Sequence, residues 1–248
     1  MELSGSSKGT PLLLELGGKS PQIVFNDVGD LQAVADATVR SFLWNSGQVC
    51  SAHTRLVVHE SIEEALLEKI VSRAQLYRPG NPLDAETTLG PLAGPAQRNR
   101  VKQYIERGLR EGAHAVLEGE IRETGGCYVS PTIFDRVDAK MAIAREEIFG
   151  PVLCVQRFST DDEALALANG TNYGLAATIW TRDMGRARRL ARAVKAGYVA
   201  VRTSGLEERD SGCMLSHEPQ GASGFGSELG LRGLQSYSTL KSLHFSGS

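Results

Sequence analysis

Short apolar runs alternate along the chain with longer segments that carry apolar residues on one helical face. The runs have the length and composition of buried strands, and they lie at 22–25, 54–58, 114–117, 128–134, 152–158 and 176–180. Apolar spacings of three and four predict helices between them, at about 31–43, 62–74, 95–110, 160–168 and 184–195. This alternation is typical of a parallel sheet covered on both faces. We therefore expect a three-layer α/β fold.

Three of the predicted helices carry start signals. Asp30 directly precedes the first helical face and can cap it. Ser61 with Glu64, and Thr160 with Glu163, have the spacing of capping boxes.

Near the C-terminus, Gly224-x-Gly226 does not follow a strand or complete a dinucleotide fingerprint, so we expect a structural turn there.

Composition narrows the class of protein. A 248-residue chain that is 41% hydrophobic can build a sizeable core. A net charge of −2 gives no nucleic-acid footprint and no charge-driven attachment to a membrane. Four cysteines without a CxxC spacing disfavour a zinc site and a disulfide framework, so we expect no metal and a reducing cytoplasm. No apolar run approaches the length of a membrane span, and residues 1–10 lack the apolar core of a signal peptide.

Cys50 stands at the tip of a small-residue loop. The loop Ser46-Gly47-Gln48-Val49-Cys50 ends the first helical pattern, and a buried strand follows at 54–58. A free cysteine is usually a small buried hydrophobe. Here the Gly-Gln approach allows the backbone to come close to a bound group, so we interpret Cys50 as a candidate nucleophile.

Glu15 is the candidate base. It lies in an apolar run with Leu12, Leu13, Leu14 and Leu16, where desolvation would raise the pKa of its carboxyl toward neutrality. His53 offers an alternative partner for the thiol, but three residues in a turn seldom align two side chains, and a polar loop histidine is the favoured interpretation.

The two motifs resemble the active-site signatures of the aldehyde dehydrogenase superfamily. Leu-Glu-Leu-Gly-Gly-Lys-Ser-Pro at 14–21 is followed, 35 residues after its glutamate, by the cysteine of Gly-Gln-Val-Cys. The resemblance continues in the family's order and covers nearly the whole chain, through Glu147–Val152, Asn172–Ala177, Ser223–Gly226 and Glu228–Gly230. The chain looks like the catalytic, C-terminal portion of a dehydrogenase about twice as long. The first half, with its cofactor-binding βαβ units and an oxyanion-hole asparagine, has no counterpart in this sequence.

The resemblance implies a function and a set of roles. An aldehyde would be oxidised to a carboxylate with NAD or NADP through a Cys50 thioester, which a water activated by Glu15 would cleave. Glu147 would hold the nicotinamide ribose, Phe149 would pack near the ring, and Gln97 is weakly matched to a glutamine near the same ribose. We expect a remnant of the cofactor-binding region at 1–25, a catalytic domain at 26–226, and a C-terminal helix and oligomerisation strand at 227–248.

The alternating segment Tyr237–Phe245 predicts that terminal strand, and with it a homo-oligomer. Two departures from the family pattern suggest a rebuilt substrate mouth: Arg202 stands where the family commonly has Asn, and 215–221 replaces a Pro-Phe-Gly-Gly approach. Two other functions stay open. A cofactor-free thiol hydrolase would need only Cys50 and Glu15, and an assembly module would need no chemistry.

Overall fold

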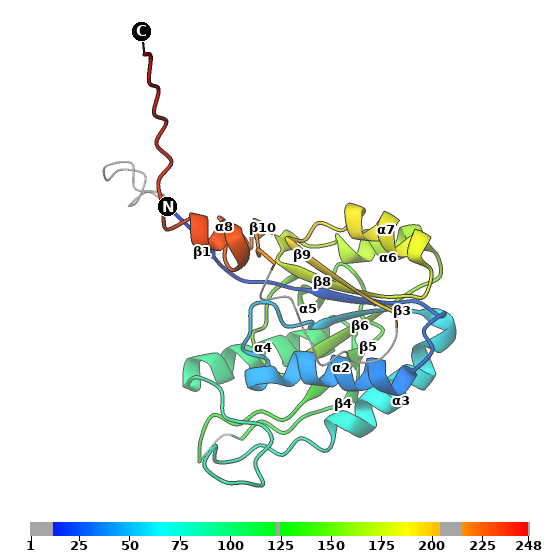
Figure 1. Ribbon diagram of the computed structural model, residues 1–248. Helices are drawn as coiled ribbons and strands as arrows, with labels where there is room; N and C mark the ends of the chain where they lie inside the picture. The colour runs from blue at the N-terminus through cyan, green and yellow to red at the C-terminus, as the bar shows by residue number, and fades with distance from the viewer. Residues whose placement is uncertain (1–11, 123–124, 204–214, 248) are drawn as a thin grey trace.

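The computed structural model describes residues 12–122, 125–203 and 215–247, and its centre is one seven-stranded sheet (Figure 1). The strands lie in the order β4 (His114–Leu117), β5 (Thr132–Asp135), β6 (Val152–Phe158), β3 (Arg55–His59), β2 (Pro21–Val24), β8 (Ala176–Trp180) and β9 (Tyr198–Arg202). Every neighbouring pair is parallel except β4 and β5. The expected parallel sheet is thus confirmed with one antiparallel edge. The described part of the connection from β4 to β5 contains no helix, whereas parallel strands are usually joined by a helical crossover.

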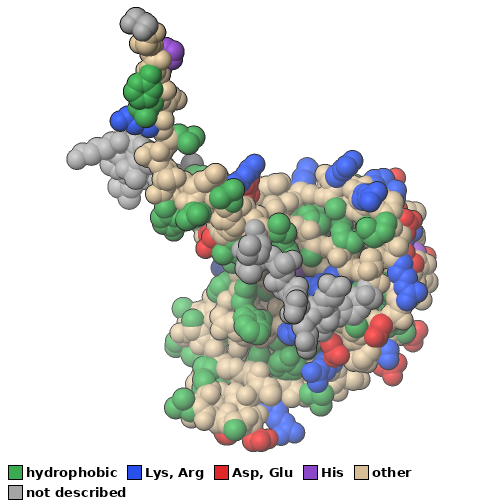
Figure 2. Space-filling view, in the orientation of Figure 1, with side chains coloured by type: hydrophobic (Ala, Val, Ile, Leu, Met, Phe, Trp, Pro, Cys, Tyr) green, Lys and Arg blue, Asp and Glu red, His purple; other side chains and the backbone are tan. Residues whose placement is uncertain are grey.

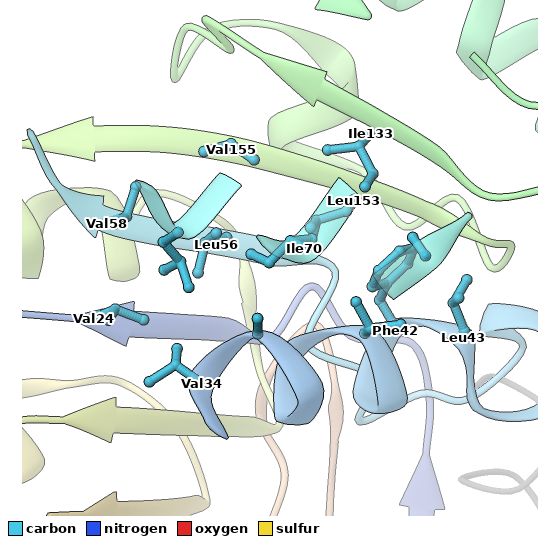
Figure 3. Packing of buried hydrophobic residues seen from close by; sticks show 14 of the residues in the cluster. Val24, Val34, Phe42, Leu43, Leu56, Val58, Ile70, Ile133, Leu153 and Val155 are labelled. Carbon is cyan, nitrogen blue, oxygen red and sulfur yellow. The ribbon is translucent and has the colours of Figure 1, made fainter. Parts of the chain in front are cut away.

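Helices cover both faces of the sheet, which confirms the three layers (Figure 1). One face packs against α2 (Leu31–Leu43) and α3 (Glu63–Ala74). The other face packs against α4 (Pro95–Arg110), α5 (Ala142–Arg145), α6 (Asp161–Ala168) and α7 (Met184–Ala193). Figure 3 shows the first of these contacts, where Val34 and Phe42 of α2 lie over Val24 and Leu56 of the sheet.

Strand alternation decides which residues enter which layer. Leu56 and Val58 of β3 point toward α2 and α3, whereas Val57 between them packs under α6 and α7. Because successive side chains of a strand point to opposite faces, a strand buried on both sides is apolar throughout. This is why these strands appear in the sequence as continuous apolar runs.

Two predicted helix starts are confirmed and one is wrong. Asp30 Oδ1 accepts from Gln32 N at 2.9 Å and Ala33 N at 3.0 Å, and Thr160 with Glu163 forms a complete capping box. The predicted box at Ser61 does not form. A short 3₁₀ turn, η2 (Glu60–Ile62), comes first, because His59 Nδ1 accepts from the Ser61 N–H at 3.2 Å.

Two small antiparallel ribbons hold the C-terminal region against the rest of the chain. One joins β1 (Leu14–Glu15) to β11 (Gly224–Phe225), and the other joins β7 (Tyr173–Gly174) to β10 (Gln220–Gly221). The first ribbon explains why position 224 is a glycine. A Cβ at Gly224 would lie 1.8 Å from Leu14 O, and the φ of Gly224 is +117°. The turn at Gly224 is therefore structural.

After α8 (Gly230–Gln235) the chain runs out as an exposed segment. The single chain forms no strand at 239–247, in contrast to the strand expected over Tyr237–Phe245. A strand needs a second edge to pair with, and the described strands place none beside the segment. Exposed apolar side chains gather on α8 and the segment after it (Figure 2): Leu231, Leu234, Tyr237, Leu240, Leu243 and Phe245. Among the described residues, no helix combines the length and the apolar character needed to cross a bilayer.

Candidate active site

The family-like motifs meet at the amino ends of the parallel strands. Glu15 precedes β2, Cys50 precedes β3, Glu147 precedes β6 and Leu175 precedes β8. These strands are neighbours that run in one direction, so the loops before them gather at one edge of the sheet. Open α/β sheets usually bind ligands at the carboxyl ends of their strands. This site lies at the opposite edge.

A left-handed turn presents Cys50. Within η1 (Trp44–Gly47), Asn45 has φ +48°, Ser46 has φ +57° and Gly47 has φ +75°. Such a run is costly for residues with a Cβ and persists only where the surroundings hold it. Ser46 Oγ donates to Gly90 O at 2.7 Å, and Gln48 Oε1 accepts from the Ala93 N–H at 2.8 Å. Both bonds hold the turn against the segment 90–93.

The Gly17-Gly18 pair allows the glutamate and cysteine motifs to touch. A Cβ at Gly18 would lie 2.2 Å from the carbonyl oxygen of Cys50, and one at Gly17 would lie 2.4 Å from Glu147 Oε2. The Gly18 N–H donates to Glu147 Oε1 at 2.9 Å. At Gly18 the close atom belongs to the backbone, so only glycine permits this approach, and at Gly17 the missing side chain leaves room for the Glu147 carboxylate.

The Cys50 thiol is half-buried, and burial raises its pKa. Backbone N–H groups of Ser51 and of Cys50 itself act in the opposite direction by donating toward the sulfur, while the charges of Glu15 and Glu147 raise the pKa further. The resting side chain is therefore a thiol with N–H donors already in place beside it. Those donors are the kind that stabilise a developing oxyanion.

Glu15 is placed by strand pairing rather than by an apolar pocket. The expected apolar environment is wrong, because Leu12, Leu13 and Leu16 are exposed and Glu15 itself is only half-buried. Burial still raises the pKa of Glu15, and the charge of Glu228 raises it further. Its Oε1 is buried without a hydrogen-bond partner in the described structure.

Glu228 is a residue of the site that sequence reasoning did not assign. Its segment carried a signal, since Glu228-Leu229-Gly230 belongs to the quoted motifs. The backbone of Glu228 pairs with that of His217 at 2.7 and 2.9 Å, and this bridge fixes its position. The like charge of Glu228 then acts on Glu15.

Phe149 holds a conformation that is rare for an aromatic residue. Its φ is +60°, and the side chain is half-buried. Gln97 supports this turn by donating from Nε2 to Ile148 O at 3.1 Å and to Phe149 O at 2.7 Å. Gln97 is thus an internal brace of the Glu147–Gly150 loop, which the sequence alone did not indicate.

His53 is engaged away from the thiol. Its Nδ1 lies 2.9 Å from Ser41 Oγ and its Nε2 lies 3.0 Å from Thr178 Oγ1, so both ring nitrogens have hydroxyl partners. Burial, together with the charge of Arg202, lowers the pKa of His53 to about 4. The histidine is a neutral bridge between α2 and β8, and no Cys-His pair forms.

Lys19 is a buried lysine that sequence reasoning also left unassigned. It is 1% exposed, its Nζ has no hydrogen-bond partner in the described structure, and burial lowers its pKa. The neighbouring Arg55 donates from Nε to Lys19 O at 2.8 Å. The Arg55 guanidinium thus braces the backbone between the glutamate motif and β3.

A cavity of about 600 Å³ opens beside the cysteine turn. Val49 and Ser51, the two neighbours of Cys50, line it. Its walls come from one face of α2 and from β8 and β9, with His217 and Leu229 at the remaining side. Cys50 itself is not among the lining residues, so the cavity opens beside its loop.

The other two described cysteines lie in surroundings that differ from those of Cys50. Cys154 is buried in β6, where Sγ donates to Ile143 O at 3.1 Å, and Cys127 is half-buried. Cys213 lies outside the described residues. Within the described ranges, no cluster of three or more His, Cys, Asp or Glu side chains could hold a metal ion.

Comparison with known proteins gives a consistent family. The sequence model of the aldehyde dehydrogenase family matches residues 1–243. Betaine aldehyde dehydrogenase of Cereibacter sphaeroides is 42% identical over 234 residues, which are 93% of this chain and 47% of that protein. The NADP/NAD-dependent aldehyde dehydrogenase PuuC of Escherichia coli is 41% identical over 98% of this chain and 48% of its own length.

Solved structures of aldehyde dehydrogenases also resemble this chain. The aldehyde dehydrogenase KauB from Pseudomonas aeruginosa superposes with a TM-score of 0.89 at 42% identity, covering 97% of this chain and 48% of that one. An indole-3-acetaldehyde dehydrogenase in complex with NAD⁺ gives the same TM-score, identity and coverage. The chain spans about half the length of the curated relatives it matches.

Proposed function

The chain belongs to the aldehyde dehydrogenase family, and we propose that it is the catalytic portion of an NAD(P)-dependent enzyme that oxidises an aldehyde to a carboxylate. The observation that supports this most directly is the packing of the Cys50 turn against the Gly17-Gly18 segment, with Glu15 and Glu147 acting electrostatically on the thiol. A cavity of about 600 Å³, which Val49 and Ser51 line beside Cys50, would admit the substrate.

Cys50 is the proposed nucleophile. Its sulfur adds to the carbonyl carbon, and the electron pair of the C=O bond moves to the oxygen, which the N–H donors beside the sulfur stabilise. Glu15 is the proposed base for the hydrolytic step. Because its pKa is raised, its carboxylate is a better acceptor for the proton of the attacking water than an ordinary glutamate.

The residues at the Glu147–Gly150 loop fit one end of a nicotinamide cofactor. Glu147 Oε1 is held by the Gly18 N–H, and its Oε2 has no hydrogen bond among the described residues, so one carboxylate oxygen is available to a ribose hydroxyl. Phe149 offers a half-buried aromatic face beside it. When bound, NAD(P) supplies the acceptor for the hydride that the Cys50 adduct loses on becoming a thioester.

The organisation of the whole protein is also part of the proposal. We assign the catalytic domain to the seven-stranded sheet and its helices, and extend the expected bounds 26–226 to include β2, which lies in the middle of that sheet. The segment before β2 is assigned to the edge of a cofactor-binding region, and 227–248 to an oligomerisation segment. The exposed apolar side chains after Gly230 support assembly with a second copy. The cysteine pattern supports a cytoplasmic location.

The experiment that tests this function uses the purified 248-residue chain. NAD and NADP binding is measured by calorimetry, and NAD(P)H formation is followed with a panel of aldehydes, for the wild type and for Cys50→Ala. Binding with turnover that Cys50→Ala abolishes is the expected result if the chain forms a working nicotinamide site. Turnover that survives in Cys50→Ala would contradict the assignment of the nucleophile.

A second candidate activity, a thiol esterase, is favoured by one observation. The groups that acyl transfer needs, a thiol, a base with a raised pKa and N–H donors at the sulfur, are all within the described residues. Ester cleavage that needs Cys50 and is independent of NAD would identify it.

A further inference from the structure

The cavity beside the Cys50 loop is lined by two arginines and by aromatic side chains from several elements. On α2, Ala37, Arg40 and Ser41 line it from one face of the helix, and Trp44, which follows α2 at the start of η1, lines it as well. On β9, the alternate residues Tyr198, Ala200 and Arg202 line it. Ala200 leaves room in the middle of this wall, and the larger side chains stand at its two ends.

Strand register places Arg202 at the far end of the cavity. Tyr198 pairs with Ala176 at the amino ends of β9 and β8, and Arg202 pairs with Trp180 at their carboxyl ends. At a rise of about 3.3 Å per residue, the backbone of Arg202 lies roughly 13 Å along the strand from that of Tyr198. The Cys50 loop lies at the amino ends, so Arg202 is set back from the thiol by the length of a small substrate.

Arg202 is half-buried and is held in place by an aromatic ring. Its guanidinium carbon lies 5.8 Å from the centroid of the Trp180 ring, a cation–π contact. Its charge also reaches His53 on the cavity wall, where it lowers the histidine pKa. Among the described residues, neither Arg202 nor Arg40 forms an ion pair or a side-chain hydrogen bond.

Among the described lining residues, these charges have no negative counterpart. None of the described residues that line the cavity is Asp or Glu, and His53 is neutral because its pKa is about 4. A partly enclosed cleft lined by charges of one sign concentrates ligands of the opposite sign. A guanidinium with free N–H donors pairs with a carboxylate in a fork geometry that an ammonium cannot reproduce.

We propose that this site selects aldehydes that carry a carboxylate at the end remote from the aldehyde group, with Arg202 as the residue that binds the carboxylate and Arg40 as a second positive charge on the opposite wall. This inference rests on the proposed function of Cys50. Cationic aldehydes such as betaine aldehyde are disfavoured by the same two charges.

The test needs no cofactor, because an aldehyde adds reversibly to the Cys50 thiol. The S–C bond forms, the carbonyl π pair moves to the oxygen, and the thiol proton ends on that oxygen as a thiohemiacetal. Each adduct blocks alkylation of Cys50 by iodoacetamide, which peptide mass spectrometry follows residue by residue. The protecting aldehydes are 5-oxopentanoate, its neutral methyl ester and betaine aldehyde, applied to the wild type, Arg202→Asn, Arg202→Lys and Arg188→Asn.

We expect 5-oxopentanoate to protect Cys50 at a concentration about tenfold or more below the concentration that its methyl ester needs. A hydrogen bond to a charged group contributes enough binding free energy for a difference of this size. Arg202→Asn removes this preference, Arg202→Lys retains part of it, and Arg188→Asn on the exposed face of α7 leaves it unchanged. Equal protection by the acid and its ester in the wild type would overturn the carboxylate preference while leaving Cys50 as the nucleophile. Protection of Cys50 by none of the three aldehydes would overturn both proposals.

Discussion

The backbone N–H of Gly18 donates to Glu147 Oε1 across 2.9 Å, joining residues that are 129 positions apart in the chain. Gly18 also lies against the carbonyl of Cys50. One dipeptide thus connects the candidate base motif, the nucleophile turn and the cofactor loop. The geometry of all three depends on the absence of a side chain at Gly18.

Gly18→Ala is therefore expected to distort the site. Its Cβ would lie 2.2 Å from Cys50 O, which the backbone must relieve by moving. We expect a loss of about 1–3 kcal/mol in the free energy of unfolding, measured by urea denaturation, and weaker protection of Cys50 by aldehydes. Gly94→Ala is the matched control, since no atom lies within 4 Å of its added Cβ. Equal losses in the two variants would contradict this account of Gly18.

Glu15→Gln is expected to make Cys50 more acidic. The Glu15 charge raises the pKa of the thiol, so its removal lowers that pKa and increases the thiolate fraction at a given pH. The pH profile of Cys50 alkylation should move to lower pH, with several-fold faster alkylation near neutrality. Glu68→Gln, on the exposed face of α3, is the control. An unchanged profile in Glu15→Gln would mean that the two side chains are not coupled.

His53 predicts a pH dependence of stability. Its pKa falls from 6.5 to about 4 on folding, so the unfolded chain binds the proton more readily, and stability is lost as pH falls from 6.5 toward 4. Between pH 7 and pH 5 this contributes up to about 2 kcal/mol to the free energy of unfolding. Urea denaturation at both values should show a smaller pH effect in His53→Gln by that amount. An identical pH effect in the two proteins would exclude His53 as its source.

Gln97→Ala tests the brace of the Phe149 turn. The substitution leaves the carbonyls of Ile148 and Phe149 without the donor that lies 3.1 and 2.7 Å away. We expect a cost of about 1–2 kcal/mol in the free energy of unfolding and, if the chain binds NAD, a weaker affinity by calorimetry. Gln103→Ala, an exposed residue of the same helix, should cost less than about 0.5 kcal/mol. A negligible loss in the free energy of unfolding of Gln97→Ala would show that the Phe149 turn does not depend on these two hydrogen bonds.

Much of the fold follows from local patterns. Strands buried on both faces are apolar at every position, as Leu56–Val58 shows, and the cap at Asp30 depends on residues within one turn. The predictions that failed did so for two reasons: a competing local hydrogen bond formed, or the pairing of a strand depended on residues distant in the sequence. His59 displaces the predicted box at Ser61, and the direction of β4 depends on a connection whose path no periodicity reveals.

The candidate site likewise has a part that the sequence predicts and a part that it does not. Cys50, Glu15, Glu147 and Phe149 lie in motifs that the sequence displays, and the structure brings their loops to one edge of the sheet. The cavity was not predictable, because its wall combines one face of α2 with alternate residues of β8 and β9. The electrostatic coupling of Glu228 to Glu15 likewise depends on the β1–β11 pairing between the two ends of the chain.

The central claim is that Cys50 forms a covalent adduct with aldehydes. Its most direct measurement is the rate of iodoacetamide alkylation at Cys50 and Cys127, followed by peptide mass spectrometry with and without a neutral aldehyde. The pH is held near 9, where enough thiolate is present despite the raised pKa. We predict that the aldehyde slows alkylation of Cys50 in a saturable manner and leaves Cys127 unchanged. Equal slowing at both cysteines, or none at Cys50, would contradict the assignment of Cys50 as the nucleophile.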